Sequence, residues 1–335
     1  MEVKELPPNE FTYALIEDFA RSNYEQGYAQ LQLLSGAVNR KVPHQVFALY
    51  EQETILMIAT LYFNQAISYQ ERKVALFGNY EALEVSDEHI AFFFSVLEKE
   101  ASSQGASFLI GPMNGSSWEN YRLSEKLKEN YSFEPIHKRY YHQQLKKNGF
   151  REIEEYYTHE VPDLKSLDQF RSKSDSEGEA LKDCTIVKID LNDFTAELAK
   201  LYPLFIRSFE GSLFFSPLTE EEFIDKFKAY KSRVHPELTI IAKDKAGNYV
   251  GCYFSFEDPK RKGKTIILKT IARDPHPKFK GLGQLMGMHV YKQAKELGYK
   301  NMLHAFMHSE KGSTQLSLKY HGDHFNTYYL YGKEL

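Results

Sequence analysis

The chain has 335 residues, of which 42% are hydrophobic and 26% are charged, a composition typical of a globular protein rather than a disordered one. The length predicts two domains, and the net charge of −4 provides no global attraction to nucleic acid or to an anionic membrane. Two cysteines, Cys184 and Cys252, exclude a disulfide scaffold and a cysteine-rich zinc site. The chain opens with charged residues and has no long apolar stretch, so we expect no signal peptide, no membrane span and a cytoplasmic protein.

The first half alternates between helical and strand patterns. Residues 11–34 have helical spacing, residues 46–50 and 55–63 read as a strand hairpin, and residues 74–81 read as a third strand. Asp87 is expected to cap a helix that ends at Gly105. A strand over 108–113, a short helix over 140–148 and an extended segment over 150–161 complete this half.

The second half repeats this order of elements. A strand at 185–189 precedes helices over 194–209 and 220–234, and a hairpin follows over 238–256. A strand over 265–272, a glycine-containing turn and an amphipathic helix come next. The chain closes with a strand over 301–307, a short helix around 315–320 and a strand over 325–331. The repetition predicts a degenerate domain at 1–162, a polar linker at 163–183 and a second domain at 184–335.

The turn between residues 274 and 284 has the features of a ligand-binding site. Gly281 and Gly283 allow the backbone to approach a ligand closely, and the helix that starts there presents unpaired N–H groups and the positive end of its dipole. Lys278 and Lys280 add positive charge. Together these features predict a pyrophosphate site, although two glycines also suit an ordinary turn between a strand and a helix.

The segment from Lys278 to Gly283 resembles the Arg/Gln-x-x-Gly-x-Gly/Ala loop of the GNAT superfamily of acyl-CoA-dependent N-acyltransferases. Lys278 departs from the usual Arg or Gln, but a lysine still pairs with phosphate. The resemblance implies an α+β fold with two tandem GNAT-like domains, each a mixed, mostly antiparallel sheet flanked by helices.

The resemblance also implies roles for individual residues. Ile271 and Arg273 match positions whose backbone pairs with the pantetheine arm of CoA, and the Ile271 N–H would face the thioester carbonyl. Strand 301–307 would separate from strand 265–272 and open a slot for that arm. The residues implied to hold the cofactor are Ile271, Arg273, Lys278, Phe279, Lys280, Gly281, Leu282, Gly283 and Gln284, and no metal is expected.

The sequence has no tyrosine at the position where the family often has its general acid. The family often places a tyrosine four residues before a Gly-Phe pair, and counting back from Gly322 leads to Leu318, which cannot donate a proton. Tyr320 and Tyr328 are the alternative acids, and either could instead be a packing residue. For the base, Glu210, Glu257 and His304 are candidates, with a neutral His304 taking a proton from the amine directly or through water, or serving only a structural role.

The first half has no comparable loop, because the turn at 84–88 is acidic and lacks glycine. It resembles the degenerate halves of tandem bacterial GNAT proteins, with Trp118 and Arg122 forming either a ligand-binding rim or a packed turn. The predicted activity is transfer of an acyl group from acetyl-CoA, or another acyl-CoA, to a small-molecule or peptide amine. The alternatives are a Fem-type aminoacyl transferase, which needs a basic face for tRNA, and a CoA-binding protein without catalysis.

Overall fold

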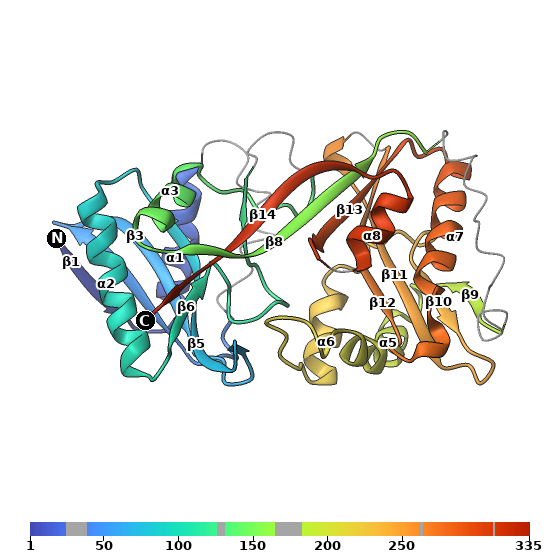
Figure 1. Ribbon diagram of the computed structural model, residues 1–335, viewed down its shortest axis with the longest axis horizontal. Coiled ribbons are helices and arrows are strands. Elements are labelled where there is room, and N and C mark those ends of the chain that lie inside the picture. The colour runs from blue at the N-terminus through green and yellow to red at the C-terminus, as the bar shows by residue number, and fades with distance from the viewer. Residues whose placement is uncertain (25–38, 126–130, 165–182, 262–263, 311) are drawn as a thin grey trace. The chain divides into compact units, whose positions relative to one another are not determined.

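The computed structural model describes residues 1–24, 39–125, 131–164, 183–261, 264–310 and 312–335 (Figure 1). The chain forms two compact units. The first comprises residues 1–155, 213–216 and 327–335, and the second comprises residues 156–212 and 217–326. The expected linker at 163–183 lies almost entirely outside the described residues.

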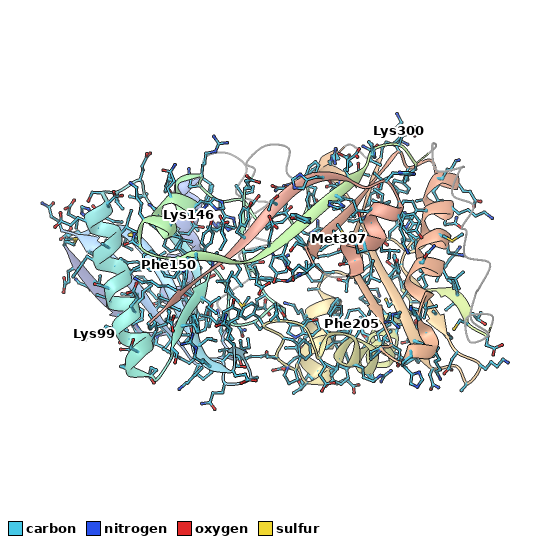
Figure 2. The ribbon with its side chains drawn as sticks, viewed as in Figure 1. Lys99, Lys146, Phe150, Phe205, Lys300 and Met307 are labelled. Carbon is cyan, nitrogen blue, oxygen red and sulfur yellow. The ribbon has the colours of Figure 1, made fainter. Side chains whose placement is uncertain are left out.

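The first unit is a mixed sheet with strand order β1-β2-β3-β5-β6-β14, in which only β5 and β6 run parallel. Its strands are β1 (Glu2–Leu6), β2 (His44–Glu51), β3 (Thr54–Tyr62), β4 (Ser68–Tyr69), β5 (Arg72–Ala82), β6 (Phe108–Gly111), β7 (Leu123–Ser124) and the last part of β14 (Asp323–Glu334). Its helices are α1 (Glu10–Asn23), α2 (Asp87–Ser103) and α3 (Tyr140–Lys147). Phe77 and Phe150 pack on Phe94 of α2, so this helix covers one face of the sheet (Figure 2).

The second unit is a mixed sheet with strand order β8-β13-β12-β11-β10-β9, in which only β12 and β13 run parallel. Its strands are the last part of β8 (Arg151–Val161), from residue 156 on, together with β9 (Thr185–Lys188), β10 (Ile240–Lys243), β11 (Tyr249–Glu257), β12 (Thr265–Arg273) and β13 (Asn301–His308). Its helices are α5 (Phe194–Phe209), α6 (Glu220–Lys228), α7 (Leu282–Glu296) and α8 (Gly312–Lys319).

Helices cover both faces of the second sheet. Adjacent residues of a strand point to opposite faces. On β11, the Phe254 ring contacts Phe227 of α6, whereas Tyr253 belongs to the core that includes Met286 of α7. Helices α5 and α6 therefore lie on one face and α7 on the other, with Phe205 of α5 buried against α6 (Figure 2).

The two halves of the sequence exchange strands. Residues Tyr331–Glu334 at the end of β14 pair with β6 of the first unit, and β8 pairs with β13 of the second unit from Tyr156 to Val161. The division of the chain at 162 and 184 assigns residues 327–335 to the second half, whereas the compact units assign them to the first. The reason is that β6 needs an antiparallel neighbour, and the last strand of the chain supplies it.

The α+β class and the mostly antiparallel sheets are confirmed, and three local expectations are corrected. Ser86, not Asp87, caps α2, because its hydroxyl accepts the N–H of His89. The helix expected over 220–234 ends at Lys228, since Val234 bridges to Phe256 as extended backbone. Strand β1 was not expected, because its charged, exposed residues form an edge strand whose sequence lacks apolar alternation. Among the described residues, no helix is long and apolar enough to cross a bilayer.

The pH dependence of the first unit's stability is predicted from Glu81. Glu81 is half-buried at the end of β5 and accepts hydrogen bonds from the hydroxyl of Tyr141 at 2.7 Å and from Nδ2 of Asn23 at 3.2 Å. Burial is the largest cause that raises the pKa of Glu81 to about 7. The protonated carboxyl therefore stabilises the folded unit at low pH, and this contribution is lost as the pH rises through 7.

We expect Glu81→Gln to remove about 2 kcal/mol of the fall in unfolding free energy between pH 5 and pH 8, because the amide does not ionise. Urea unfolding at a series of pH values measures this difference against the unmutated protein. The matched control is Glu88→Gln, on an exposed residue of α2, which should leave the pH dependence unchanged. Equal slopes for both variants would contradict the role of Glu81.

Candidate functional site

The parallel strands of the second unit separate part-way along their length. β12 and β13 pair from Thr265↔Asn301 to Leu268↔His304 and no further. Each strand is irregular directly beyond that point, since the pairing of β12 with β11 shifts register at Phe254/Ser255 and the pairing of β13 with β8 shifts between His304 and Met307. Phe306 has a φ of +60°, the left-handed conformation that few non-glycine residues adopt. Beyond Leu268, the edge of β12 that faces β13 therefore has no strand partner among the described residues, and we call this open edge the slot.

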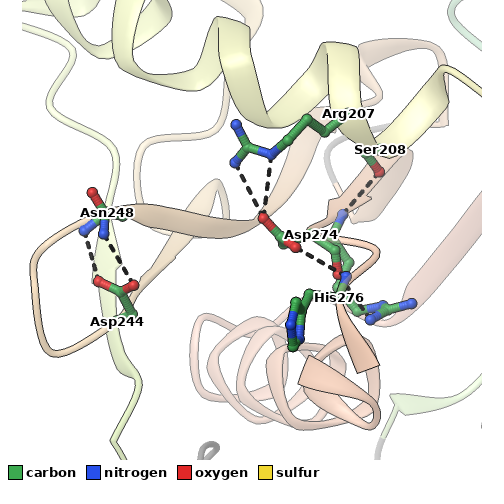
Figure 3. Close-up of polar contacts among 7 residues, drawn as sticks. Arg207, Ser208, Asp244, Asn248, Asp274 and His276 are labelled. Atoms are coloured by element: carbon green, nitrogen blue, oxygen red, sulfur yellow. Dashed lines mark hydrogen bonds and ion pairs between the residues drawn. The ribbon is translucent and has the colours of Figure 1, made fainter. Parts of the chain in front are cut away.

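The backbone of Ile271 faces this open edge. Asp274 donates its N–H to the Val250 carbonyl of β11, so in the antiparallel register the groups of Ile271 and Arg273 point away from β11. The Arg273 N–H donates to Ser208 Oγ of α5 at 3.0 Å (Figure 3). Of the two expected edge positions, the Ile271 N–H has no partner in the described part of the chain, whereas the Arg273 N–H does.

The turn before α7 offers three backbone donors. Gly281 is the N-cap of α7 and has a φ of +95°, which a glycine adopts without strain. The N–H groups of Phe279 and Lys280 bond to carbonyls within the turn, and that of Gln284 bonds back to Gly281. In the described chain, the N–H groups of Gly281, Leu282 and Gly283 have no protein partner, as expected for the first residues of a helix. The predicted set of donors therefore narrows to residues 281–283.

The side chains of the turn divide between core and surface. Phe279 and Leu282 are buried, so only their backbone can reach a ligand. Lys278 lies over the ring of Phe279, with Nζ 4.7 Å from its centroid, and Lys280 is exposed. A Cβ at Gly283 would meet only Leu316 at 3.9 Å, so packing within the protein does not explain the glycine there. The turn can therefore bind an anion through backbone donors and two lysines.

Comparison with known proteins was made at the level of sequence and of structure. No family model matches the chain, and no curated protein matches its sequence. A tandem GNAT protein from the clavulanic acid biosynthesis pathway matches 99% of this chain and 98% of its own, at 10% identity and a TM-score of 0.53. A GCN5-related N-acetyltransferase from Anabaena variabilis and a probable N-acyltransferase from Enterococcus faecalis each have a TM-score of 0.57 over 99% of this chain and 73% and 72% of theirs, at 9% and 11% identity.

This chain has the tandem GNAT fold. The resemblance of the glycine turn predicts this fold, and the prediction of the fold is confirmed. In this GNAT fold the slot and the turn both belong to the second unit, where the resemblance located the CoA site.

Tyr320 anchors the start of α7. Its hydroxyl donates to the Gln284 carbonyl at 2.9 Å, and the hydroxyl of Tyr253 donates to the Gly283 carbonyl at 2.6 Å. The Tyr320 ring is buried and stacks on Tyr291 with centroids 4.3 Å apart, and burial raises the pKa of Tyr320. These contacts favour a role in holding the turn over a role as the general acid.

His304 lies at the last pair before the strands separate, but both ring nitrogens are occupied. Nε2 contacts the hydroxyl of Tyr291, and Nδ1 lies 2.6 Å from Ser317 Oγ. Burial is the largest cause that lowers the pKa of His304 to about 3. The ring is therefore neutral at physiological pH and is held by α7 and α8. This arrangement favours the structural alternative over direct removal of a proton from an amine.

Tyr328 belongs to the first compact unit, whereas the slot belongs to the second. Its hydroxyl donates to Glu134 Oε1 at 2.5 Å and lies 3.3 Å from the hydroxyl of Tyr131. Tyr328 is fully buried, as a core residue would be. The remaining base candidates lie at element ends, with Glu210 at the C-cap of α5 and Glu257 exposed at the end of β11.

A hollow of about 490 Å³ borders the turn on the α5 side. Arg207 of α5 pairs with Asp274 at 3.2 Å, and Asp274 also accepts the His276 N–H (Figure 3). Asp244 accepts hydrogen bonds from Asn248, which lower its pKa. No pattern in the sequence points to Arg207 or Asp244, because they reach the turn from separate elements and share no motif.

The slot of the first unit is filled by the chain itself. β5 and β6 pair only from Val74 to Leu76, and beyond that point the Met113 N–H donates to the Phe77 carbonyl at 2.7 Å. The side chains of Asn79 and Asn114 are hydrogen-bonded at 2.7 Å, and the Asn79 N–H donates to Asn114 Oδ1 at 2.9 Å. The edge of β5 that matches the open edge of β12 is therefore occupied.

Proposed function

We propose that the protein is an acyl-CoA-dependent N-acyltransferase, with acetyl-CoA as the donor and a small-molecule or peptide amine as the acceptor. The observation that carries this proposal is that one unit holds both the open edge of β12 and, at the start of α7, N–H groups that have no partner in the described chain. A thioester supplies an activated acyl group that an amine can attack directly. We place the reaction in the cytoplasm, where the thiols of Cys184 and Cys252 would remain reduced.

Different residues of the second unit would bind different parts of acyl-CoA. The N–H groups of residues 281–283 would hold the pyrophosphate, together with Lys278 and Lys280. The Ile271 N–H would donate to the thioester carbonyl oxygen, where negative charge develops during the attack. A preformed donor and an oriented amine account for most of the rate in this scheme.

The leaving thiolate needs no dedicated acid in this proposal. A thiol has a pKa near 8.5, so the thiolate is a tolerable leaving group at neutral pH. The Tyr320 hydroxyl donates a hydrogen bond to the Gln284 carbonyl, and the Tyr328 hydroxyl donates one to the Glu134 carboxylate. Their contacts support packing and anchoring roles.

Two measurements test the proposed function. Calorimetry with CoA should give one site per chain, and turnover of acetyl-CoA with a panel of amines should release free thiol. Binding without turnover for any amine would support the alternative of a CoA-binding protein without catalysis. Absence of CoA binding would overturn the proposal.

Tyr320→Phe should weaken CoA binding about fivefold and leave kcat near normal, because the loss of one hydrogen bond to the Gln284 carbonyl loosens the first turn of α7. Calorimetry and steady-state kinetics measure the two effects separately. Tyr299→Phe is the matched control, because its hydroxyl bonds His235 and not α7. A fall in kcat of about 100-fold would instead identify Tyr320 as the acid.

Leu318→Tyr is expected to fold normally and to leave the rate unchanged or raise it. Leu318 is 52% exposed on α8, so the larger side chain meets no packed neighbours, and stability should change by less than about 0.5 kcal/mol. Leu297→Tyr, on a residue that is 43% exposed, is the control for adding an exposed ring. Thermal unfolding checks the stability, and an unfolded Leu318→Tyr protein would show that the alignment of this helix is wrong.

A further inference from the structure

Two histidines of the second unit share one serine hydroxyl. Ser317 of α8 lies with Oγ 2.6 Å from His304 Nδ1 and 2.9 Å from His159 Nδ1. His304 and His159 are cross-strand neighbours on β13 and β8, at the level where β12 and β13 separate. Beyond His304, Nε2 contacts the Tyr291 hydroxyl. The four side chains form one hydrogen-bonded chain from Tyr291 to His159.

The number of protons available in this hydrogen-bonded chain decides which groups donate and which accept. Each neutral imidazole carries one N–H, and each hydroxyl carries one O–H. Ser317 is buried, and the two histidines are the only partners of its hydroxyl among the described residues, so its O–H goes to one histidine and its oxygen accepts from the other. All donors therefore point the same way. Either Tyr291 donates inward and His159 ends the chain as an acceptor at Nδ1, or His159 donates from Nδ1 and Tyr291 ends the chain as an acceptor.

The second direction leaves a buried donor unpaired. Tyr291 is buried, and the only partner of its hydroxyl among the described residues is His304 Nε2. If Nε2 donated to Tyr291, the tyrosine O–H would lose its only acceptor, and an unpaired buried hydroxyl pays its full desolvation cost. The first direction pairs every group within the hydrogen-bonded chain and leaves only the Nε2–H of His159 without a protein acceptor. It places the proton of His304 on Nδ1 and the proton of His159 on Nε2.

The Nε2 atom of His159 is the outer end of this hydrogen-bonded chain. The residue is only 4% exposed, and Nε2 has no protein partner in the described part of the chain, yet this atom is not among the fully enclosed unpaired atoms. The ring is held tightly, because it stacks on Tyr157 and a Cβ at Gly322 would come within 3.1 Å of its Cβ. His324 faces it with ring centroids 6.3 Å apart.

We propose that His159 is a ligand-facing hydrogen-bond donor of the second unit, fixed by Ser317, His304 and Tyr291 as the tautomer with its proton on Nε2. Its N–H takes an acceptor oxygen, such as that of a carboxylate or a carbonyl, from a bound substrate and excludes an ammonium at the same place. Burial and His324 lower the pKa of His159, while Asp323 raises it, and the ring is neutral at pH 7.5. Ser317 and His304 are positioning residues in this arrangement.

Histidine tautomers are measured directly by two-bond ¹⁵N–¹H correlation of the full-length protein at pH 7.5, with signals assigned through His159→Gln and His304→Gln. We expect His159 to carry its proton on Nε2 and His304 to carry its proton on Nδ1. Ser317→Ala should convert His159 to a mixture of tautomers, whereas Ser313→Ala, on the same helix, should not. A proton on Nδ1 of His159 or on Nε2 of His304 in the unmutated protein would overturn the proposal.

The ligand class is tested with small probes at equal ionic strength. Sodium acetate should shift the His159 Nε2–H signal, and ethylammonium chloride should not. The acetate shift should be lost in Ser317→Ala and retained in Ser313→Ala. No acetate shift, or an equal shift with ethylammonium, would overturn the assignment of an acceptor-binding donor. None of these measurements uses CoA, so a failure of the proposed acyltransferase function is seen separately, by calorimetry.

Discussion

Gly281→Glu should weaken CoA binding by at least about 100-fold. The new carboxylate would stand at the N-terminus of α7, where it occupies the positive end of the helix dipole and repels a pyrophosphate. It also places a side chain where the backbone must approach the ligand closely, next to the N–H groups of Leu282 and Gly283. Calorimetry with CoA measures the change.

Gly298→Glu is the matched control for this substitution. Gly298 follows the other end of α7 and has a φ of +84°, close to the +95° of Gly281, so both variants carry the same kind of backbone strain and the same added charge. A carboxylate at the C-terminal end of the helix should leave CoA affinity within about threefold. Equal losses in both variants would mean that strain in α7, not the phosphate site, controls binding.

Gly78→Ala should destabilise the first unit by about 3 kcal/mol, because the slot there has no space for a methyl group. A Cβ on Gly78 would lie 2.2 Å from Asn114 Oδ1 and 2.6 Å from the Met113 carbonyl oxygen. Both atoms belong to the segment that occupies the edge of β5. Calorimetric unfolding should show the loss in the transition of the first unit.

Gly211→Ala is the control, because a Cβ at that position meets nothing within 4 Å. CoA affinity should stay within about twofold of normal in both variants, since the turn at Gly281 belongs to the second unit. If Gly78→Ala folded with unchanged stability, the segment at Met113 and Asn114 would have room to move. The first slot would then be open to a ligand, contrary to this interpretation.

The prediction of a single CoA site now has a second physical reason. The sequence pointed to the acidic turn at 84–88, which would repel a pyrophosphate. The structure adds the hydrogen bonds from Met113 and Asn114 to the edge of β5. No periodicity or motif in the sequence predicts that this edge is occupied. The occupation depends on where another segment of the same protein, at Met113 and Asn114, lies after folding.

Local patterns in the sequence determined most of the elements of this protein. The hairpins, the helix after Gly281 and the repeated order of strands and helices follow from apolar periodicity, glycines and caps, which act over a few residues. The glycine turn likewise identified the GNAT fold before any contact was known, because a close backbone approach to phosphate requires particular residues at fixed spacing.

Only the tertiary structure decided which residues share a site. Three features join residues far apart in sequence: the exchange of β8 and β14 between the two halves of the sequence, the anchoring of α7 by Tyr320, and the hydrogen-bonded chain from Tyr291 to His159. Tyr320, Tyr328 and His304 were chosen as catalytic candidates by residue type and spacing, but their hydrogen-bond partners set their chemistry. Spacing along a strand or helix cannot specify such partners, because they come from other elements and are set by packing.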